Sequence, residues 1–133
     1  MAANPHGPAM PVLEPPDAAG FRLPPEDAPH RRTLMQWPVD RRVYPHTSLL
    51  ESVQATVAHI ANAIPAFEPV ALLAAEAAHA GARAKLSRAV ELWDIASDDL
   101  WCRDSGPIFV VDPRGAVAVS HIRFNGWGGK QSG

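Results

Sequence analysis

The chain has 133 residues, of which 47% are apolar, and a formal net charge of −2 at pH 7. One domain at most fits this length, and the apolar content argues against disorder in the body of the chain. The basic residues are scattered, so we expect neither a nucleic-acid nor a membrane partner, and no apolar stretch is as long as a membrane span. The single cysteine excludes an internal disulfide, which is typical of a reducing compartment and predicts a cytoplasmic protein.

The beginning of the chain is rich in proline. Residues 1–29 contain eight of the fourteen prolines and show neither a helical nor a strand period. We therefore expect residues 1–19 to form an extended or disordered leader, with a docking peptide for a proline-binding domain as the alternative. Residues 33–37 predict a short strand that ends at Pro38.

The first long helix is expected from Ser48. Ser48 and Glu51 have the spacing of a capping box, in which each side chain accepts a free amide hydrogen at the helix start. Apolar residues then recur every three or four positions up to Pro65, which predicts a helix with one buried face. These residues are Leu49, Leu50, Val53, Val57, Ile60 and Ile64.

The following segments alternate between strand and helix patterns. Residues 70–74 form a continuous apolar run, as in a strand that is buried on both faces. Residues 75–89 are rich in alanine and predict a helix that Gly81 divides into two pieces. Pro113 and Gly115 predict the turn of a hairpin. Further strands are expected at 90–96, 108–111 and 116–124, which makes the fold mixed α/β.

A segment between two of these strands, residues 98–107, carries the densest group of reactive side chains. Its sequence is DDLWCRDSGP. A carboxylate beside the face of Trp101 suits a flat cation such as a guanidinium, because the acid accepts paired hydrogen bonds while the ring stacks. The alternative, which composition alone favours, is a surface ion pair of Arg103 with Asp99 or Asp104 and a tryptophan that belongs to the core.

Three spaced motifs, in this order, resemble the agmatine deiminase and bacterial peptidyl-arginine deiminase family. They are Met35-Gln36-Trp37-Pro38, the Trp-x-Arg-Asp-x-Gly-Pro pattern that begins at Trp101, and FNGWGGKQ at 124–131. The resemblance covers about residues 20–131 but only the opening part of a typical member. It implies a pentein-type α/β propeller, of which residues 20–133 would be an incomplete N-terminal portion: the first strand-helix unit and the start of the second.

The resemblance also implies roles for individual residues. Asp104 matches a carboxylate that grips the guanidinium, and Trp101 and Trp127 match the walls of its slot. A structural place near the site is implied for Asp99, Arg103, Gly106, Asn125, Gly128 and Gly129. For Gly128 and Gly129, a tight turn that needs positive φ explains the residue type at least as well as a ligand contact.

The reaction that the resemblance implies is hydrolysis of agmatine to N-carbamoylputrescine and ammonia in putrescine biosynthesis, with peptidyl or free arginine as the alternative substrate. This chemistry needs a cysteine nucleophile and a histidine acid/base. In the family both lie beyond the part that this chain matches, and no metal or organic cofactor is implied. We expect Cys102 to be a small buried residue, on one face with Asp104 if 101–104 is extended, and His121 to be structural. The alternative of another class is a truncated, inactive guanidinium-binding or assembly module, and an oligomer is left open.

Overall fold

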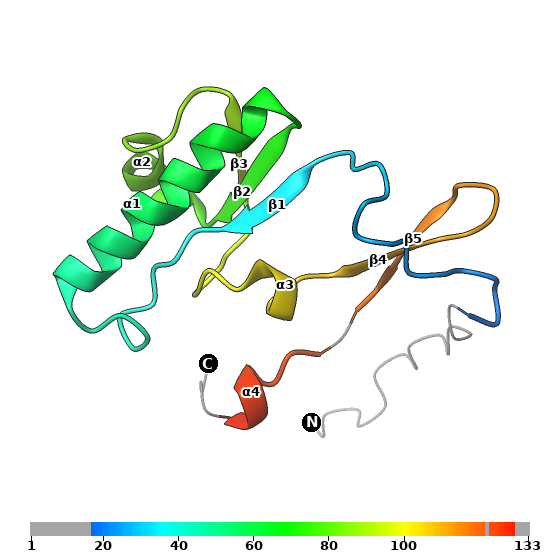
Figure 1. The fold of residues 1–133 in the computed structure, drawn as a ribbon. Helices are drawn as coiled ribbons and strands as arrows, with labels where there is room; N and C mark the ends of the chain where they lie inside the picture. The colour runs from blue at the N-terminus through cyan, green and yellow to red at the C-terminus, as the bar shows by residue number, and fades with distance from the viewer. Residues whose placement is uncertain (1–16, 122, 130–133) are drawn as a thin grey trace, which may run out of the picture.

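The computed structural model describes residues 17–121 and 123–129. The expected leader, residues 1–19, therefore falls almost entirely outside the described residues. The described part is α/β, with a three-stranded sheet, a two-stranded sheet and helices between the strands (Figure 1). This confirms the mixed α/β class. No helix among the residues described is long and apolar enough to cross a membrane.

The three-stranded sheet is wholly parallel. It consists of β1 (Thr33–Gln36), β2 (Val70–Ala74) and β3 (Val90–Asp94), in the order β1-β2-β3. Every residue of the central strand β2 is buried. The continuous apolar run at 70–74 therefore has its predicted meaning, because a strand covered on both faces leaves no polar side of the pleat.

Two helices connect these strands and cover the sheet. α1 (Thr47–Ala63) joins β1 to β2, and α2 (Glu76–Arg83) joins β2 to β3 (Figure 1). A short 3₁₀ turn, Ile64–Ala66, ends α1 at the predicted proline. The core joins side chains of both helices to one face of the sheet. Its buried members include Val57, Ala58, Ala61, Val70, Leu72, Ala74, Ala82 and Val90.

The start and the buried face of α1 differ from the prediction. The capping box is wrong: α1 begins at Thr47, its N-cap is His46, and no side chain caps it. The guanidinium of Arg41 binds both the Pro45 carbonyl and the Thr47 hydroxyl, so the chain enters the helix one residue before Ser48. The predicted stripe is also only partly buried. Leu49 and Ile60 are 46% and 47% exposed.

The predicted break at Gly81 is wrong as well. α2 continues through Gly81 and ends at Arg83, and residues 84–89 form turns instead of a second helix. A glycine inside a helix costs only about 1 kcal/mol relative to alanine, which neighbouring contacts readily offset. The Arg83 guanidinium donates to the carbonyls of Ser87 and Val90 and so closes the connection to β3.

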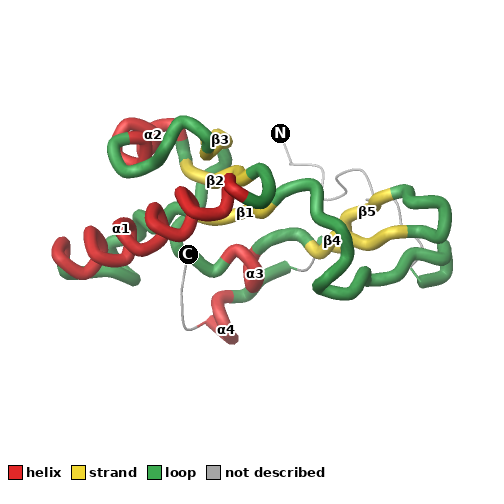
Figure 2. The backbone as a smooth tube through the Cα atoms, turned by 45° about the horizontal axis from the view of Figure 1, so that its top comes forward, coloured by secondary structure: helices red, strands yellow, loops and turns green. Residues whose placement is uncertain are grey.

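The second sheet is the predicted hairpin. β4 (Ile108–Val111) and β5 (Val117–Ser120) pair antiparallel, and Asp112 accepts the backbone N–H groups of Arg114 and Ala116 inside the turn. The strand predicted over 116–124 is therefore shorter at both ends. Figure 2 shows this hairpin set apart from the three-stranded sheet, with the helical turn α3 (Cys102–Ser105) between them.

Candidate functional site

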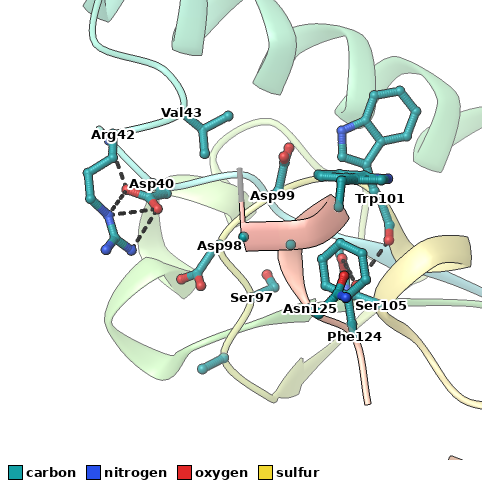
Figure 3. Close-up of a pocket in the computed structure, with 15 residues that line it drawn as sticks. Asp40, Arg42, Val43, Ser97, Asp98, Asp99, Trp101, Ser105, Phe124 and Asn125 are labelled. Atoms are coloured by element: carbon teal, nitrogen blue, oxygen red, sulfur yellow. Dashed lines mark hydrogen bonds and ion pairs between the residues drawn. The ribbon is translucent and has the colours of Figure 1, made fainter. Parts of the chain in front are cut away.

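A pocket of about 580 Å³ lies where the chain leaves β1 and β3 (Figure 3). The carboxyl edge of a parallel sheet is the usual place for ligands in α/β folds, because the loops after adjacent strands converge there. Carboxylates and aromatic rings are prominent among the side chains that line the pocket. The carboxylates are Asp40, Asp98 and Asp99, and the aromatic rings are Trp101, Phe124 and Trp127.

The loop after β3 is fastened to the ends of the neighbouring strands. The Ser97 hydroxyl donates to the carbonyls of Trp37 and Leu73, at 2.9 Å and 3.0 Å. The backbone carbonyl of Asp98 accepts the N–H groups of Val39 and Asp40, both at 3.0 Å. The backbone of this pocket wall is therefore set by the sheet and not by the exposed loop.

Asp99 is held from two sides. Its Oδ1 accepts the hydroxyl of Tyr44 at 2.5 Å and the backbone N–H of Leu100 at 2.7 Å. Burial, and then the nearby Asp99 carboxylate, raise the pKa of the Tyr44 phenol well above its ordinary value. Sequence reasoning missed Tyr44, because a single tyrosine in a connecting segment belongs to no periodic pattern.

The charges that line the pocket are mostly negative. Arg42 binds Asp40 through Nη2 at 2.9 Å, and this pair lowers the pKa of the Asp40 carboxyl. Among the lining residues within 17–121 and 123–129, Arg42 is the sole cation against the three carboxylates. A pocket with this balance attracts a cationic ligand, and its aromatic rings offer a face to a flat one.

The segment after Trp101 forms a helical turn, so the condition under which Cys102 and Asp104 would share a strand face is not met. The N–H groups of Asp104 and Ser105 both donate to the Trp101 carbonyl at 3.1 Å, which forms α3. The Ser105 hydroxyl also exchanges hydrogen bonds with the Gln36 amide at the end of β1. Cys102 and Asp104 therefore do not share a strand face. Cys102 is partly buried, and burial raises the pKa of its thiol.

The matched residues of α3 lie apart from the larger pocket. Asp104 is exposed and lines a second hollow of about 230 Å³, together with Leu34, Ile60 and Cys102. Trp101 lines both hollows. Arg103 forms an ion pair with Glu26 at 2.6 Å in solvent, so the predicted alternative pairing with Asp99 or Asp104 is not present in the structure.

The turn α4 (Gly126–Gly129) forms the aromatic wall. Gly126, Gly128 and Gly129 all have positive φ, as the tight-turn interpretation of the glycines expects, and Trp127 has φ of 54°. The Asn125 side chain accepts the Gly128 N–H at 3.0 Å and closes the turn. The Trp127 ring lies edge-on to Trp101 at 6.3 Å and to Phe124 at 4.9 Å.

The remaining candidates lie outside this arrangement. His121 is exposed, follows β5 and lines neither hollow. Within residues 17–121 and 123–129, no group of three or more histidine, cysteine, aspartate or glutamate side chains could hold a metal ion.

The fold and the pocket together define a class of protein: an α/β domain that has an acidic, aromatic pocket at the carboxyl edge of its parallel sheet. Within that class, the family model of the Porphyromonas-type peptidyl-arginine deiminases matches residues 22–133. The chain belongs to this family.

Known relatives agree with this assignment. The agmatine deiminase of Pseudomonas aeruginosa (strain LESB58) is 40% identical over 119 residues, which cover 89% of this chain and 32% of the relative. A Streptomyces coelicolor protein is 43% identical over 108 residues, covering 81% of this chain and 32% of that protein. The chain thus spans about a third of the length of the curated relatives that it matches.

Solved structures show the same fold. The agmatine deiminase of Enterococcus faecalis superposes with a TM-score of 0.68 at 25% identity, over 81% of this chain and 29% of that one. A C. jejuni agmatine deiminase solved with substrate bound gives a TM-score of 0.68 at 23% identity, over 84% of this chain and 32% of that one. The second likeness concerns the fold alone.

Proposed function

We propose that this chain is the N-terminal part of an agmatine deiminase-like hydrolase, which converts agmatine and water to N-carbamoylputrescine and ammonia. The observation that carries the proposal is the acidic, aromatic pocket on a chain that is 40% identical to an agmatine deiminase over most of its length. Carboxylates that accept paired N–H bonds beside an indole face are the groups that a guanidinium needs.

The proposed architecture is a pentein-type propeller. In it, the parallel sheet with α1 and α2 is the first strand-helix unit, and the β4–β5 hairpin begins the second. The TM-scores to solved agmatine deiminases support this arrangement. Residues 20–133 then form an incomplete N-terminal portion of the domain, preceded by the proline-rich leader at 1–19.

In the proposed site, Trp101 and Trp127 form the walls of the guanidinium slot and Asp104 grips the cation. Trp101 lines both hollows, and it therefore shares the larger one with Asp40, Asp98 and Asp99 and the smaller one with Asp104. Asp99, Arg103, Gly106, Asn125, Gly128 and Gly129 shape the surrounding backbone. The cytoplasm is the proposed compartment. Sedimentation of the protein measures whether it forms an oligomer.

The pocket favours agmatine over free arginine as the substrate. Both carry a guanidinium, but arginine also carries a carboxylate, which the lining carboxylates would repel. Because Arg42 is engaged by Asp40, its charge is largely neutralised inside the pocket. Ammonia release from agmatine should therefore exceed release from arginine.

The chemical steps need groups that the relatives carry outside the matched third. A cysteine thiolate adds to the guanidinium carbon, a C–N bond breaks with release of ammonia, and water then hydrolyses the covalent adduct and frees the thiolate. Cys102 suits this role poorly, since burial raises the pKa of its thiol and so disfavours the thiolate. In the proposed site, Trp101, Trp127 and Asp104 therefore bind and orient the cation.

The test is a hybrid in which residues 1–133 replace the matching third of the P. aeruginosa agmatine deiminase. We expect the hybrid to release ammonia from agmatine. Asp104→Asn should lower kcat/KM at least about a hundredfold, since losing about 2.7 kcal/mol of charge-assisted hydrogen bonding corresponds to that factor.

Asp98→Asn is the comparison variant: Asp98 lines the larger pocket but lies outside the matched motif, so its loss of kcat/KM should be much smaller than that of Asp104→Asn. The opposite result, a large loss in Asp98→Asn and none in Asp104→Asn, would transfer the gripping role to the carboxylate in the larger pocket. A hybrid that binds agmatine without releasing ammonia would instead favour a guanidinium-binding module.

A further inference from the structure

The contact between Tyr44 and Asp99 joins the β1–α1 connection to the pocket wall. The Tyr44 ring is buried, and its hydroxyl donates to Asp99 Oδ1 at 2.5 Å. The same oxygen accepts the N–H of Leu100 at 2.7 Å, and Leu100 directly precedes Trp101. The phenol is therefore two hydrogen bonds away from the backbone that carries the indole of the proposed slot.

The segment that carries Tyr44 is firmly held. The Tyr44 N–H donates to the Asp40 carbonyl at 2.9 Å, and the Val43 N–H donates to the same carbonyl at 3.2 Å. Asp40 is itself fastened through its N–H to the Asp98 carbonyl. The turn at 40–44 and the loop after β3 are thus joined by backbone hydrogen bonds. The Tyr44 phenol therefore has little conformational freedom and can hold the Asp99 carboxylate in one position.

Packing in the core does not require the Tyr44 hydroxyl. A buried hydroxyl costs about 1–3 kcal/mol unless it finds a hydrogen-bond partner, and phenylalanine would fill the same space without that cost. The position of the hydroxyl against a carboxylate that lines the pocket indicates a role at the pocket (Figure 3 labels Asp99 and Trp101 among the lining residues).

We propose that Tyr44 is a positioning residue of the site: through the Asp99 carboxylate it fixes the Leu100–Trp101 backbone and so sets the plane that Trp101 presents to a guanidinium. This inference rests on the proposed function. Ser97 and the Asp98 carbonyl hold the earlier part of the loop after β3. The Asp99 carboxylate, which Tyr44 contacts, instead holds the N–H of Leu100, the last residue before Trp101.

The first test measures kcat/KM for agmatine in the hybrid enzyme. Tyr44→Phe removes one hydroxyl and should lower kcat/KM about tenfold, since small misplacements of a bound reactant are costly. Asp99→Ala should have a similar or larger effect, and the double variant should be no worse than Asp99→Ala alone, because the tyrosine acts through the aspartate. Unchanged kcat/KM in Tyr44→Phe, or losses that multiply in the double variant, would overturn the proposal.

The control separates positioning from stability. Asn62 on α1 donates to the Lys85 carbonyl and accepts the Ser87 N–H, on residues that line neither hollow. Asn62→Ala should lower the melting temperature of the hybrid without lowering kcat/KM. An equal loss of kcat/KM in Asn62→Ala and Tyr44→Phe would mean that the tyrosine acts through stability alone.

The second test uses the 133-residue chain and needs no catalysis. Tyr44 is its single tyrosine, so tyrosinate absorbance at 295 nm reports this residue alone. Burial, the first cause of the raised Tyr44 pKa, stays in place, so Asp99→Ala should lower this pKa only part of the way toward its ordinary value of about 10, and Asp98→Ala should leave it unchanged. Far-UV circular dichroism confirms that each variant is folded, and Asp99→Asn, which removes only the charge, is the second variant.

The two tests fail in different ways. Equal Tyr44 titrations in the unmutated chain and in folded Asp99→Ala would overturn the contact on which the inference depends. A hybrid that releases no ammonia from agmatine, with the titration as expected, would instead count against the proposed function.

Discussion

Replacing Gly106 with alanine should destabilise the chain, and the structure gives the reason. Gly106 ends α3 and donates its N–H to the Cys102 carbonyl at 2.8 Å. A Cβ at this position would lie 2.3 Å from the same carbonyl oxygen, far inside van der Waals contact. The backbone φ of −80° is ordinary for any residue, so the obstacle is steric. The turn must open, which adds the loss of the hydrogen bond to the cost of displaced packing, together about 2–4 kcal/mol.

Gly81→Ala is the matched control, with the opposite sign. Gly81 lies inside α2, and apart from its chain neighbours and the backbone of its own helix no atom lies within 4 Å of a Cβ at this position. Alanine should therefore stabilise the chain by about 0.5–1 kcal/mol. Circular dichroism melts at one fixed protein concentration measure both, at roughly 4 °C per kcal/mol for a chain between the 60–100 and 150–250 residue classes. A melting temperature for Gly106→Ala equal to or above that of the unmutated chain would refute the steric argument.

The 133-residue chain expressed by itself should release no ammonia from agmatine or arginine above the buffer rate; release that Cys102→Ser abolishes would make Cys102 a nucleophile. Because burial raises its pKa, the Cys102 thiol should react with iodoacetamide more slowly in the folded chain than in urea, with its rate rising only at more alkaline pH; equal rates would contradict the burial. The chain should also self-associate through the apolar face of the β4–β5 hairpin, where Phe109, Val117 and Val119 are 44%, 52% and 55% exposed. The double variant Val117→Lys, Val119→Lys should shift the sedimentation coefficient toward that of a monomer. An unmutated chain that is monomeric and melts sharply would count against the one-unit architecture.

The order of the elements could be predicted because each has a strong local signal. The apolar run at 70–74 has no polar face, so it predicts a strand at the centre of a covered sheet, and β2 is that strand. The hairpin follows from Pro113 and Gly115 between two β-type runs. The boundaries were less predictable, because tertiary contacts move them. The Arg41 contacts start α1 at Thr47, and packing carries α2 through Gly81.

The pocket could be predicted only in part. Sequence patterns directed attention to Trp101 and Trp127, which the fold brings within 6.3 Å although they are far apart in the chain. They did not indicate Asp40, which lines the pocket, or Tyr44, which contacts the lining residue Asp99, since both lie in the β1–α1 connection and belong to no motif considered. The sequence did not indicate the helical turn at 102–105, because it closes on the Trp101 carbonyl and is joined to the distant Gln36 amide through Ser105.

Trp127 shows how the pocket and the stability of the chain are related. Its left-handed backbone conformation costs a non-glycine residue about 1–2 kcal/mol, and the glycines on both sides share the same sign of φ. By backbone preference alone, glycine would therefore suit position 127 best. Edge-to-face contacts with Trp101 and Phe124, at about 0.5–1.5 kcal/mol each, are together as large as this cost. The strained backbone of the turn therefore depends on the same ring contacts that form the aromatic wall of the pocket, so the wall and the turn are stable only together.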